Sequence, residues 1–183
     1  MTIQSSLPPT PPGLLTLTDW AALPEDASVR TELQEGVLIV SPRPMKAHQR
    51  VARDLTIALA TQLPESWEVL PEVDVVLRTD YPPTVRIPDL VVVPVSAREH
   101  LRATDVVVVI EIISPGSAGL DKVMKRHEYA QARIPHYWMV HPDRSITTLR
   151  LGGDGIYEET SAPKTGLCVI DEPFRFEIDL TRV

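Results

Sequence analysis

Two apolar runs dominate the pattern of hydrophobic and polar positions along the chain, at residues 90–93 and 106–113. Continuous runs of β-branched residues of this length are typical of buried strands. Each run carries one carboxylate, because Asp89 stands at the head of the first and Glu111 lies deep in the second. An unpaired buried carboxylate is costly, so two of them on strands expected to be neighbours indicate a divalent metal site.

A long segment with helical periodicity follows Pro42 and Pro44, from Met45 to about Leu63. Its apolar residues recur every four positions and form one stripe, which we expect to face the core. The stripe consists of Val51, Leu55, Leu59 and Leu63. A much shorter helix is expected after Thr18, which would cap its first turn.

The second long helix is predicted over residues 121–132. Leu120, Met124 and His127 recur at i, i+4 and i+7, so we expect these three side chains to face the core. Lys125 lies one step, about 100°, around the helix from Met124. It would therefore sit at the edge of the buried stripe, where a long side chain can reach a strand-borne carboxylate.

The remaining pattern completes a mixed architecture. The other predicted elements are a hairpin over 29–40 that turns at Glu35-Gly36, a strand pair or one broken strand over 67–77, a short helix over 96–102, a strand over 136–140, and a hairpin with a last strand over 145–183. A strand–helix–strand unit after antiparallel strands predicts an α/β fold with a mixed central β-sheet flanked by helices. We expect a Pro-rich flexible arm over residues 1–16 and a single domain over 17–183.

Charge and composition narrow the classes of function. The chain has 183 residues and a net charge of −7, which argues against a broad basic face for nucleic acid. A local basic patch is nevertheless expected at the start of the first long helix, from Arg43, Lys46, Arg50 and Arg53, close to His48. The one cysteine, Cys168, excludes an internal disulfide and a cysteine-based zinc cluster. With no apolar run that could span a membrane and no secretory signal in view, a cytoplasmic protein is expected.

Each candidate residue also has an ordinary structural explanation. Asp89 after a proline could cap a turn, and Lys125 could form an exposed i, i+4 pair with Asp121. Spacing alone favours a solvated strand-edge acid for Glu32. Glu111 is the exception, because it interrupts a long apolar run and burial without function explains it poorly.

The same residues carry a resemblance to a known family. The chain resembles the Uma-type endonucleases, a branch of the PD-(D/E)XK, restriction-endonuclease-like superfamily, over roughly residues 18–151. The matching segments are Glu32-Leu33-Gln34-Glu35-Gly36, His48-Gln49, Pro88-Asp89, Glu111-Ile112-Ile113-Ser114-Pro115, the stretch from Asp121 through Lys125 to Tyr129-Ala130, and Ile134-Pro135-His136-Tyr137-Trp138. The resemblance implies a restriction-endonuclease-like core and a divalent metal held by Asp89 and Glu111, with Glu32 as a further carboxylate.

Two departures from the superfamily pattern bear on the site. The superfamily lysine lies two residues after the glutamate, where this chain has Ile113, so Lys125 of the helix is identified as the migrated replacement. Arg133 and His141 stand where the family pattern has glycine and aspartate. Both lie away from the carboxylates in the sequence, and we expect them to affect loop shape rather than catalysis.

Three functions fit these residues. The first is a metal-dependent endonuclease on DNA, with Mg²⁺ or Mn²⁺ bound by Asp89, Glu111 and the backbone carbonyl of Ile112, with no nucleotide cofactor, and with Arg43, His48 and Lys122 near the substrate. The second is a catalytically silent nuclease fold that binds or regulates, and the third is another metal-assisted hydrolase. An apolar surface around Tyr137-Trp138 and the free strand edges of the last hairpin also suggest a homodimer.

Overall fold

The computed structural model of the chain describes residues 13–24, 28–114, 120–161 and 163–182, without the side chains of 120–122. Its elements are α1 (Leu17–Ala21), β1 (Val29–Gln34), β2 (Val37–Pro42), α2 (Lys46–Ala60), β3 (Trp67–Pro71), β4 (Val75–Arg78), β5 (Thr84–Arg86), β6 (Leu90–Pro94), β7 (Leu101–Arg102), β8 (Val108–Ile112), α3 (Leu120–Gln131), β9 (His136–Val140), β10 (Ser145–Leu151), β11 (Tyr157–Glu159), β12 (Lys164–Thr165), β13 (Leu167–Ile170) and β14 (Phe176–Asp179), with 3-10 turns at Ala103–Asp105 and Leu180–Arg182. The α/β architecture predicted from the pattern is confirmed.

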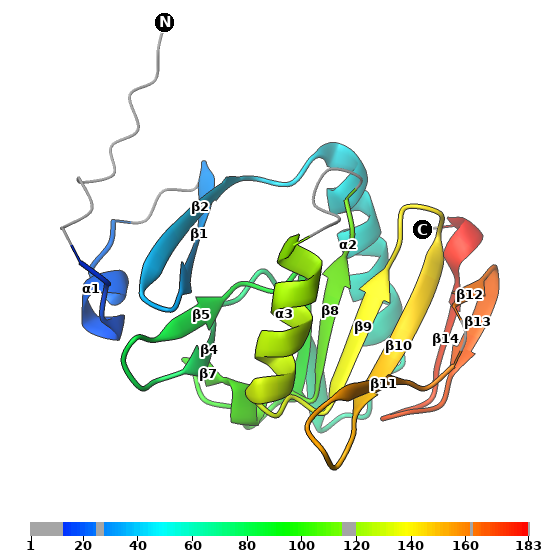
Figure 1. Cartoon of the computed structure of the whole chain (residues 1–183). Helices are drawn as coiled ribbons and strands as arrows, with labels where there is room; N and C mark the ends of the chain where they lie inside the picture. Colours follow the sequence, from blue (N-terminus) through cyan, green and yellow to red (C-terminus); the bar gives the residue numbers. More distant parts are fainter. Residues whose placement is uncertain (1–12, 25–27, 115–119, 162, 183) are drawn as a thin grey trace, which may run out of the picture.

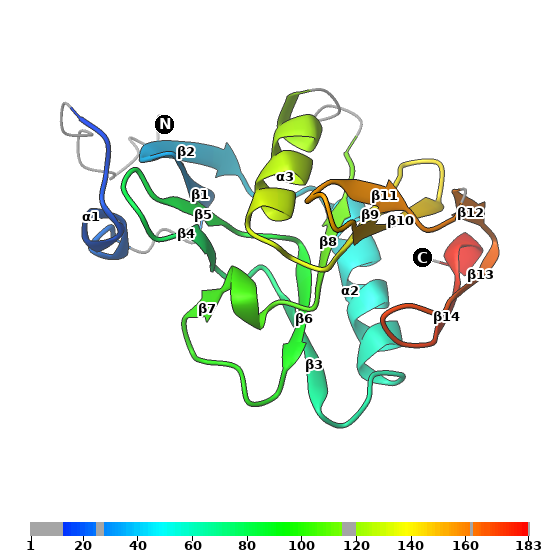
Figure 2. The ribbon, with the colours of Figure 1, turned by 60° about the horizontal axis from the view of Figure 1, so that its bottom comes forward.

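Two mixed sheets form the body of the molecule. A seven-stranded sheet has the order β11-β10-β9-β8-β6-β3, with β12 added beside β10, and a five-stranded sheet has the order β2-β1-β5-β4-β7. Strands β8 and β9 are parallel, and α3 connects them as the crossover helix. Figure 1 shows α3 on one face of the larger sheet and α2 on the other, and Figure 2 shows the same two layers from another side.

Strand alternation divides the larger sheet into two different faces. On one face, Leu90, Val108 and Trp138 pack with Leu55 and Leu59 of α2 in a large apolar cluster. The stripe predicted for α2 is therefore confirmed. The opposite face contributes Val91, Val109 and Tyr137, among others, to a second cluster that includes Tyr129 of α3.

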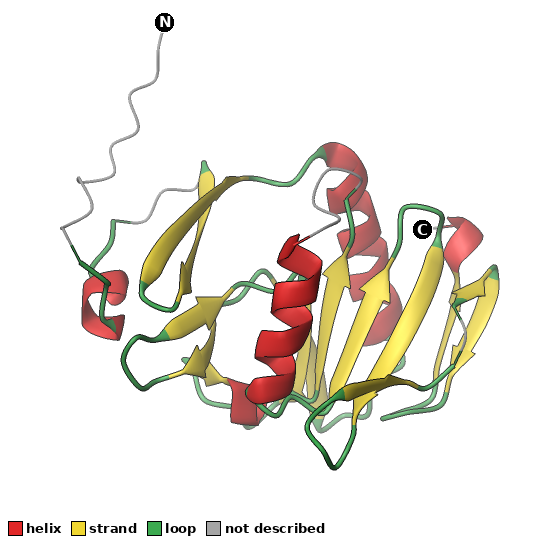
Figure 3. Cartoon of the chain, in the orientation of Figure 1, coloured by secondary structure: helices red, strands yellow, loops and turns green. Residues whose placement is uncertain are grey.

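The strands predicted over residues 67–77 belong to different sheets, so their expected pairing is wrong. Strand β3 pairs with β6 in the larger sheet, whereas β4 pairs with β5 and β7 in the smaller one. The helix predicted over residues 96–102 is wrong as well, because the chain forms turns and bends there before the short strand β7. Figure 2 shows β3 beside β6 and β4 beside β5, and Figure 3 shows the helices and strands of the chain by colour. Local periodicity does not identify the partner of a strand, since that partner is remote in the sequence.

The N-terminal part of the fold begins earlier than predicted. Thr16, not Thr18, caps α1, and it exchanges hydrogen bonds with Asp19 in a capping box. Leu15 is buried, and its N–H donates to the carbonyl of Gly36 at 2.7 Å. Leu15 thus packs into the fold within the range expected to be a flexible arm, and residues 1–12 lie outside the described residues. The turn between β1 and β2 needs Gly36, because φ is +78° and a Cβ would come within 2.6 Å of Leu14.

Several side chains lie on a different side from the one expected. On α3, Met124 is 38% exposed and His127 is exposed, whereas Lys125 and Tyr129 are buried. Tyr137 and Trp138 are fully buried, so the apolar surface expected around them is absent. No helix in the described part of the chain is long and apolar enough to span a membrane.

Candidate functional site

Two buried carboxylates lie on neighbouring strands, as the pattern predicts. Strands β6 and β8 are antiparallel and place Leu90 opposite Ile110, which brings Asp89 and Glu111 to the same end of the pair. Asp89 is 2% exposed and Glu111 is 6% exposed. The backbone N–H of Ile112 donates to Asp89 Oδ2 at 2.7 Å, so the carboxylate of Asp89 reaches across to β8 beside Glu111.

Glu111 takes its partners from α3. Lys125 Nζ donates to Glu111 Oε1 at 3.0 Å, and the hydroxyl of Tyr129 donates to the same oxygen at 2.6 Å. Lys125 and Tyr129 are four residues apart and therefore lie on one face of the helix. With 8% exposure, Lys125 lies on the buried face itself rather than at its edge. Lys125 is therefore not an exposed side chain, and the side chain of Asp121, the partner considered for it from the sequence, lies outside the described residues.

Glu32 is also buried, at 5% exposure, so its expected place at a solvated strand edge is wrong. Its Oε1 accepts the N–H of Ile87 at 2.9 Å and lies 3.9 Å from Lys125 Nζ. Its Oε2 accepts Arg86 Nη1 at 3.1 Å. Arg86 also donates through Nε and Nη2 to both oxygens of Glu128 on α3, at 2.7 and 2.9 Å. This fork ties β5 of the smaller sheet to the helix that carries Lys125.

Asp89 is held by the side chains of Arg30 and His48 as well as by the Ile112 N–H. Arg30 Nη1 donates to Asp89 Oδ1, and His48 Nε2 lies within hydrogen-bond distance of Asp89 Oδ2, each at 3.1 Å. Arg30 comes from β1 and His48 from the first turn of α2. Glu32, Asp89 and Glu111, called the carboxylate cluster below, thus converge from strands of both sheets and are surrounded by positive groups.

These surroundings move the pKa values of the carboxylate cluster in opposite directions. Burial raises the pKa of Asp89, but the hydrogen bond and charge of His48, the charge of Arg30 and the Ile112 N–H outweigh burial and lower it to about 2. Burial is also the main effect on Glu111, and it raises the pKa although the charge of Lys125 opposes it. For Glu32, burial is outweighed by Lys125, Arg30 and the Ile87 N–H, so the pKa is lowered.

The remaining predicted site residues lie outside the carboxylate cluster. Arg43 is exposed and pairs with Glu72 at 3.3 Å, and Lys46, Arg50 and Arg53 are exposed along the same start of α2. The side chain of Lys122 lies outside the described residues. No site role was predicted from the sequence for four contributors: Arg30, Arg86, Glu128 and Tyr129. Glu128 and Tyr129 had a local signal, because they follow Lys125 by three and four positions on a helix already predicted.

The donor set fits a hard divalent cation that keeps several waters. Such ions use one or two carboxylates together with carbonyl oxygens, and Asp89, Glu111 and the adjacent Ile112 backbone offer this combination. The oxygens of Glu32 accept hydrogen bonds from Ile87 and Arg86, and those of Asp89 accept them from Arg30 and the Ile112 N–H, so a bound ion would compete with these donors. In the part of the chain that the structure describes, no group of three or more His, Cys, Asp or Glu is arranged to hold a metal.

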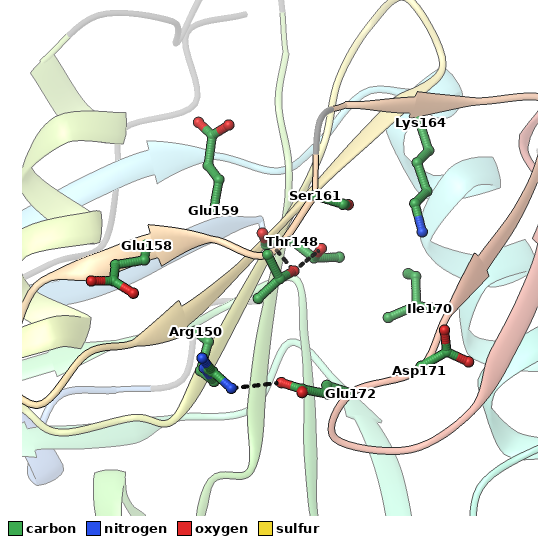
Figure 4. Close-up of a pocket in the computed structure, with 10 residues that line it drawn as sticks. Thr148, Arg150, Glu158, Glu159, Ser161, Lys164, Ile170, Asp171 and Glu172 are labelled. Atoms are coloured by element: carbon green, nitrogen blue, oxygen red, sulfur yellow. Dashed lines mark hydrogen bonds and ion pairs between the residues drawn. The ribbon is translucent and has the colours of Figure 1, made fainter.

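A separate polar cavity of about 350 Å³ lies between the β10–β11 strands and β13. Thr148 at its wall shares a hydrogen bond with Thr160, and Figure 4 shows Arg150 paired with Glu172. Lys164 donates to the carbonyl of Val169. None of the residues that line this cavity belongs to the carboxylate cluster, so the chemistry predicted from the sequence lies elsewhere.

Comparison with known proteins identifies the family. The chain is similar to a solved structure from Anabaena variabilis ATCC 29413, described as "a putative nuclease belonging to DUF820", with 18% sequence identity and a TM-score of 0.71. The match covers 91% of this chain and 96% of the other, and it confirms the expected nuclease-type fold. No curated protein matches the chain. The Uma2 family, described as "Putative restriction endonuclease", matches residues 17–181, so the chain belongs to the Uma2 family.

Proposed function

We propose that this chain is a metal-dependent endonuclease that hydrolyses phosphodiester bonds of DNA. The observation that carries the proposal is the contact of Lys125 Nζ with Glu111 Oε1 at 3.0 Å. In the superfamily pattern, a lysine two residues after the glutamate supplies a cation, and this chain has Ile113 at that position. Lys125 of α3 places a cation beside Glu111 instead. The descriptions of the family and of the similar solved structure support the same class of activity.

Each residue of the site has a defined task in this proposal. Asp89, Glu111 and the backbone carbonyl of Ile112 would hold Mg²⁺ or Mn²⁺. The bound ion would supply Lewis-acid stabilisation of the charge that develops on the phosphate. The ammonium group of Lys125 orients the attacking water or neutralises the scissile phosphate. Glu32, 3.9 Å from Lys125 Nζ, keeps this ammonium beside Glu111.

The DNA backbone would approach along the start of α2. Arg43, Lys46, Arg50 and Arg53 are exposed there, and exposed basic side chains contact phosphates without regard to sequence. His48 lies in the same turn and reaches Asp89, so it joins this surface to the carboxylate cluster. Lys122 stays a predicted substrate contact. No nucleotide cofactor is needed for this chemistry.

Association and location complete the proposal. A homodimer would place two sites on the two strands of a duplex. Tyr137 and Trp138 are buried, so the apolar surface expected around them no longer supports a homodimer. The other support is the two-stranded sheet β13–β14, which pairs with no further strand in the described residues. Sedimentation as a monomer at tens of micromolar, the order for weak pairs, would contradict the dimer. We expect the protein to act in the cytoplasm, in keeping with its single cysteine.

One observation favours a catalytically silent binding or regulatory module instead. Both oxygens of Asp89 are already engaged by Arg30 and His48, and among the described residues no three His, Cys, Asp or Glu side chains are placed to hold one ion together. A nuclease fold does not by itself imply cleavage. This alternative predicts DNA binding without strand breakage at any divalent ion concentration.

Cleavage of supercoiled plasmid with Mg²⁺ or Mn²⁺ tests the proposal. Wild type should nick or linearise the plasmid, and Glu111→Gln should not. Lys125→Met should reduce the rate about 10²-fold or more, because a cation beside the reacting phosphate is lost. Lys164→Met is the matched control, since Lys164 lines the separate cavity, and it should cleave as wild type does.

The other outcomes separate the alternatives. DNA that is bound but never cut by the wild type supports the silent module. Hydrolysis of a small phosphodiester without plasmid cleavage supports a different metal-assisted hydrolase. Full activity of Lys125→Met, in a preparation where Glu111→Gln is inactive, would remove Lys125 from the site.

A further inference from the structure

Arg30 occupies an unusual place for a buried arginine. Its side chain is only 10% exposed, its Nη1 donates to Asp89 Oδ1, and its Nε lies 3.9 Å from Glu32 Oε1. Burial opposes the charged guanidinium, but the charges of Glu111, Asp89 and Glu32 outweigh burial and raise the pKa of Arg30 above its ordinary value. One guanidinium therefore interacts with all three members of the carboxylate cluster.

The hydrogen bonds of Arg30 are nevertheless incomplete. Among the described residues, its Nε and Nη2 are buried and have no hydrogen-bond partner. A buried donor without an acceptor costs free energy, and most buried polar groups avoid this state. Arg30 is thus held at the carboxylate cluster by charge rather than by a complementary set of acceptors.

Arg86 shows what a structural arginine looks like in the same molecule. It is 1% exposed, and its Nε, Nη1 and Nη2 all donate to carboxylate oxygens of Glu32 or Glu128. This paired, forked geometry is the arrangement that arginine favours in permanent ion pairs. The two arginines lie on neighbouring strands, β1 and β5, and differ in how completely they are satisfied.

The position of Arg30 conflicts with a metal at Asp89. Arg30 covers Asp89 Oδ1, while His48 and the Ile112 N–H cover Oδ2. A divalent ion bound to this carboxylate would stand next to the guanidinium, in a buried setting where like charges repel strongly. The two cations cannot both keep Asp89 as their partner.

We propose that Arg30 is an exchangeable counterion of the carboxylate cluster, which the divalent metal displaces when it binds. The proposal rests on the metal site of the proposed function. In the metal-free protein, Arg30 neutralises carboxylates that would otherwise be buried and uncompensated. Arg30 and the metal then compete for Asp89, so the affinity for the metal is lower than Asp89 and Glu111 would give without Arg30.

Calorimetric titration with Mn²⁺ tests the competition directly. Arg30→Gln should bind Mn²⁺ about tenfold more tightly than wild type, within the usual range of coupling between two ligands. Arg30→Lys keeps the charge and should remain much closer to wild type. Arg86→Gln is the matched control, because it removes a buried arginine that does not compete for Asp89, and it should not bind more tightly. Equal or weaker binding by Arg30→Gln would overturn the proposal.

A second measurement needs no folded Arg30→Gln. In wild type labelled with ¹⁵N-arginine, the buried Nε–H signal of Arg30 is assigned by its loss in Arg30→Lys and followed during addition of Mg²⁺. It should shift in step with Mg²⁺ binding, and a signal that stays constant while the ion binds would overturn the proposal. If neither wild type nor Arg30→Gln binds metal, the proposed function falls together with this inference. Metal binding with no effect of Arg30 refutes the inference alone.

Discussion

The two faces of the seven-stranded sheet have different roles, although the same strands form both of them. The face under α2 is apolar and is closed by Trp138, Phe174 and Phe176, whose rings lie 5.7–6.4 Å apart. The face under α3 contains Glu111 with Lys125 and Tyr129 against it. Successive residues of β8 therefore point to different faces: one packs in the apolar core, and the next belongs to the charged site. The apolar face contributes stability to a sheet whose other face carries buried charge.

The largest effect is expected from a change on the apolar face. Phe176→Ala removes a fully buried ring that stacks on Trp138, and it should lower the free energy of unfolding by about 3–5 kcal/mol. Urea unfolding measures the loss. Leu167→Ala is the control, because Leu167 is largely exposed on the neighbouring strand and should change little. Mn²⁺ affinity below the unfolding transition should not change, and a change would show that the two faces are coupled.

A smaller effect on the free energy of unfolding is expected within the charged face, where substitution of Asp89 should cost more than substitution of Glu111. The pKa of Asp89 is lowered to about 2 from 3.8, which corresponds to about 2 kcal/mol of stability from its charged form. Asp89→Asn should lose this amount at pH 7 in a metal chelator. The raised pKa of Glu111 means that its charge disfavours folding, so Glu111→Gln should cost less.

The sign of the pH dependence follows from the lowered pKa. The contribution of Asp89 is fully present above the unfolded-state pKa and is lost as pH falls toward 2. Urea unfolding between pH 2 and 7 should therefore show a steeper acid loss in wild type than in Asp89→Asn. A loss in Glu111→Gln as large as in Asp89→Asn would contradict the difference between the two acids.

The smallest effect concerns His48, which reaches from α2 to the charged face. Burial lowers the pKa of His48, but the hydrogen bond and charge of Asp89 outweigh burial and raise it. The stability that this pair contributes is present below the ordinary histidine pKa of about 6.5 and is lost as pH rises through the raised value. The loss is modest because Asp89 keeps Arg30 and the Ile112 N–H.

Thermal midpoints in a chelator, measured from pH 6 upward, provide the test. The wild-type midpoint should decline with rising pH, and the midpoint of His48→Gln should stay flatter. Parallel curves for the two proteins would show that His48 does not stabilise Asp89 through its charge.

The part of the site that could be predicted was the part with a local signal. Glu111 was identifiable because it interrupts an apolar run, and Asp89 because it begins the neighbouring one. Arg30 and Arg86 had no such signal, since their partners lie 59 and 42–54 residues away in the chain. Glu32 was misjudged for the same reason: alternation along β1 shows which residues share a face, not what covers that face.

The helix α3 shows how an apolar rule fails next to a charged surface. The buried stripe was assigned to Leu120, Met124 and His127 because core-facing helix positions are normally apolar, and of these the side chain of Leu120 lies outside the described residues. Here the surface opposite is Glu111, so Lys125 and Tyr129 are the complementary residues and lie inside. Met124 instead turns toward Gln34 of β1, with its sulfur 3.2 Å from the amide nitrogen. In the same way, the sheets to which β3 and β4 belong are determined by partner strands that are remote in the sequence.

The division of the carboxylate cluster between two sheets has a consequence for the order of folding. Glu32 and Arg30 belong to the smaller sheet, Glu111 to the larger one, and Lys125 arrives with α3, late in synthesis. Neither sheet alone contains the constellation, and contacts of such long sequence separation form slowly. We expect a nascent or partly folded chain to lack a complete site, so that the proposed hydrolytic activity appears only in the fully folded protein.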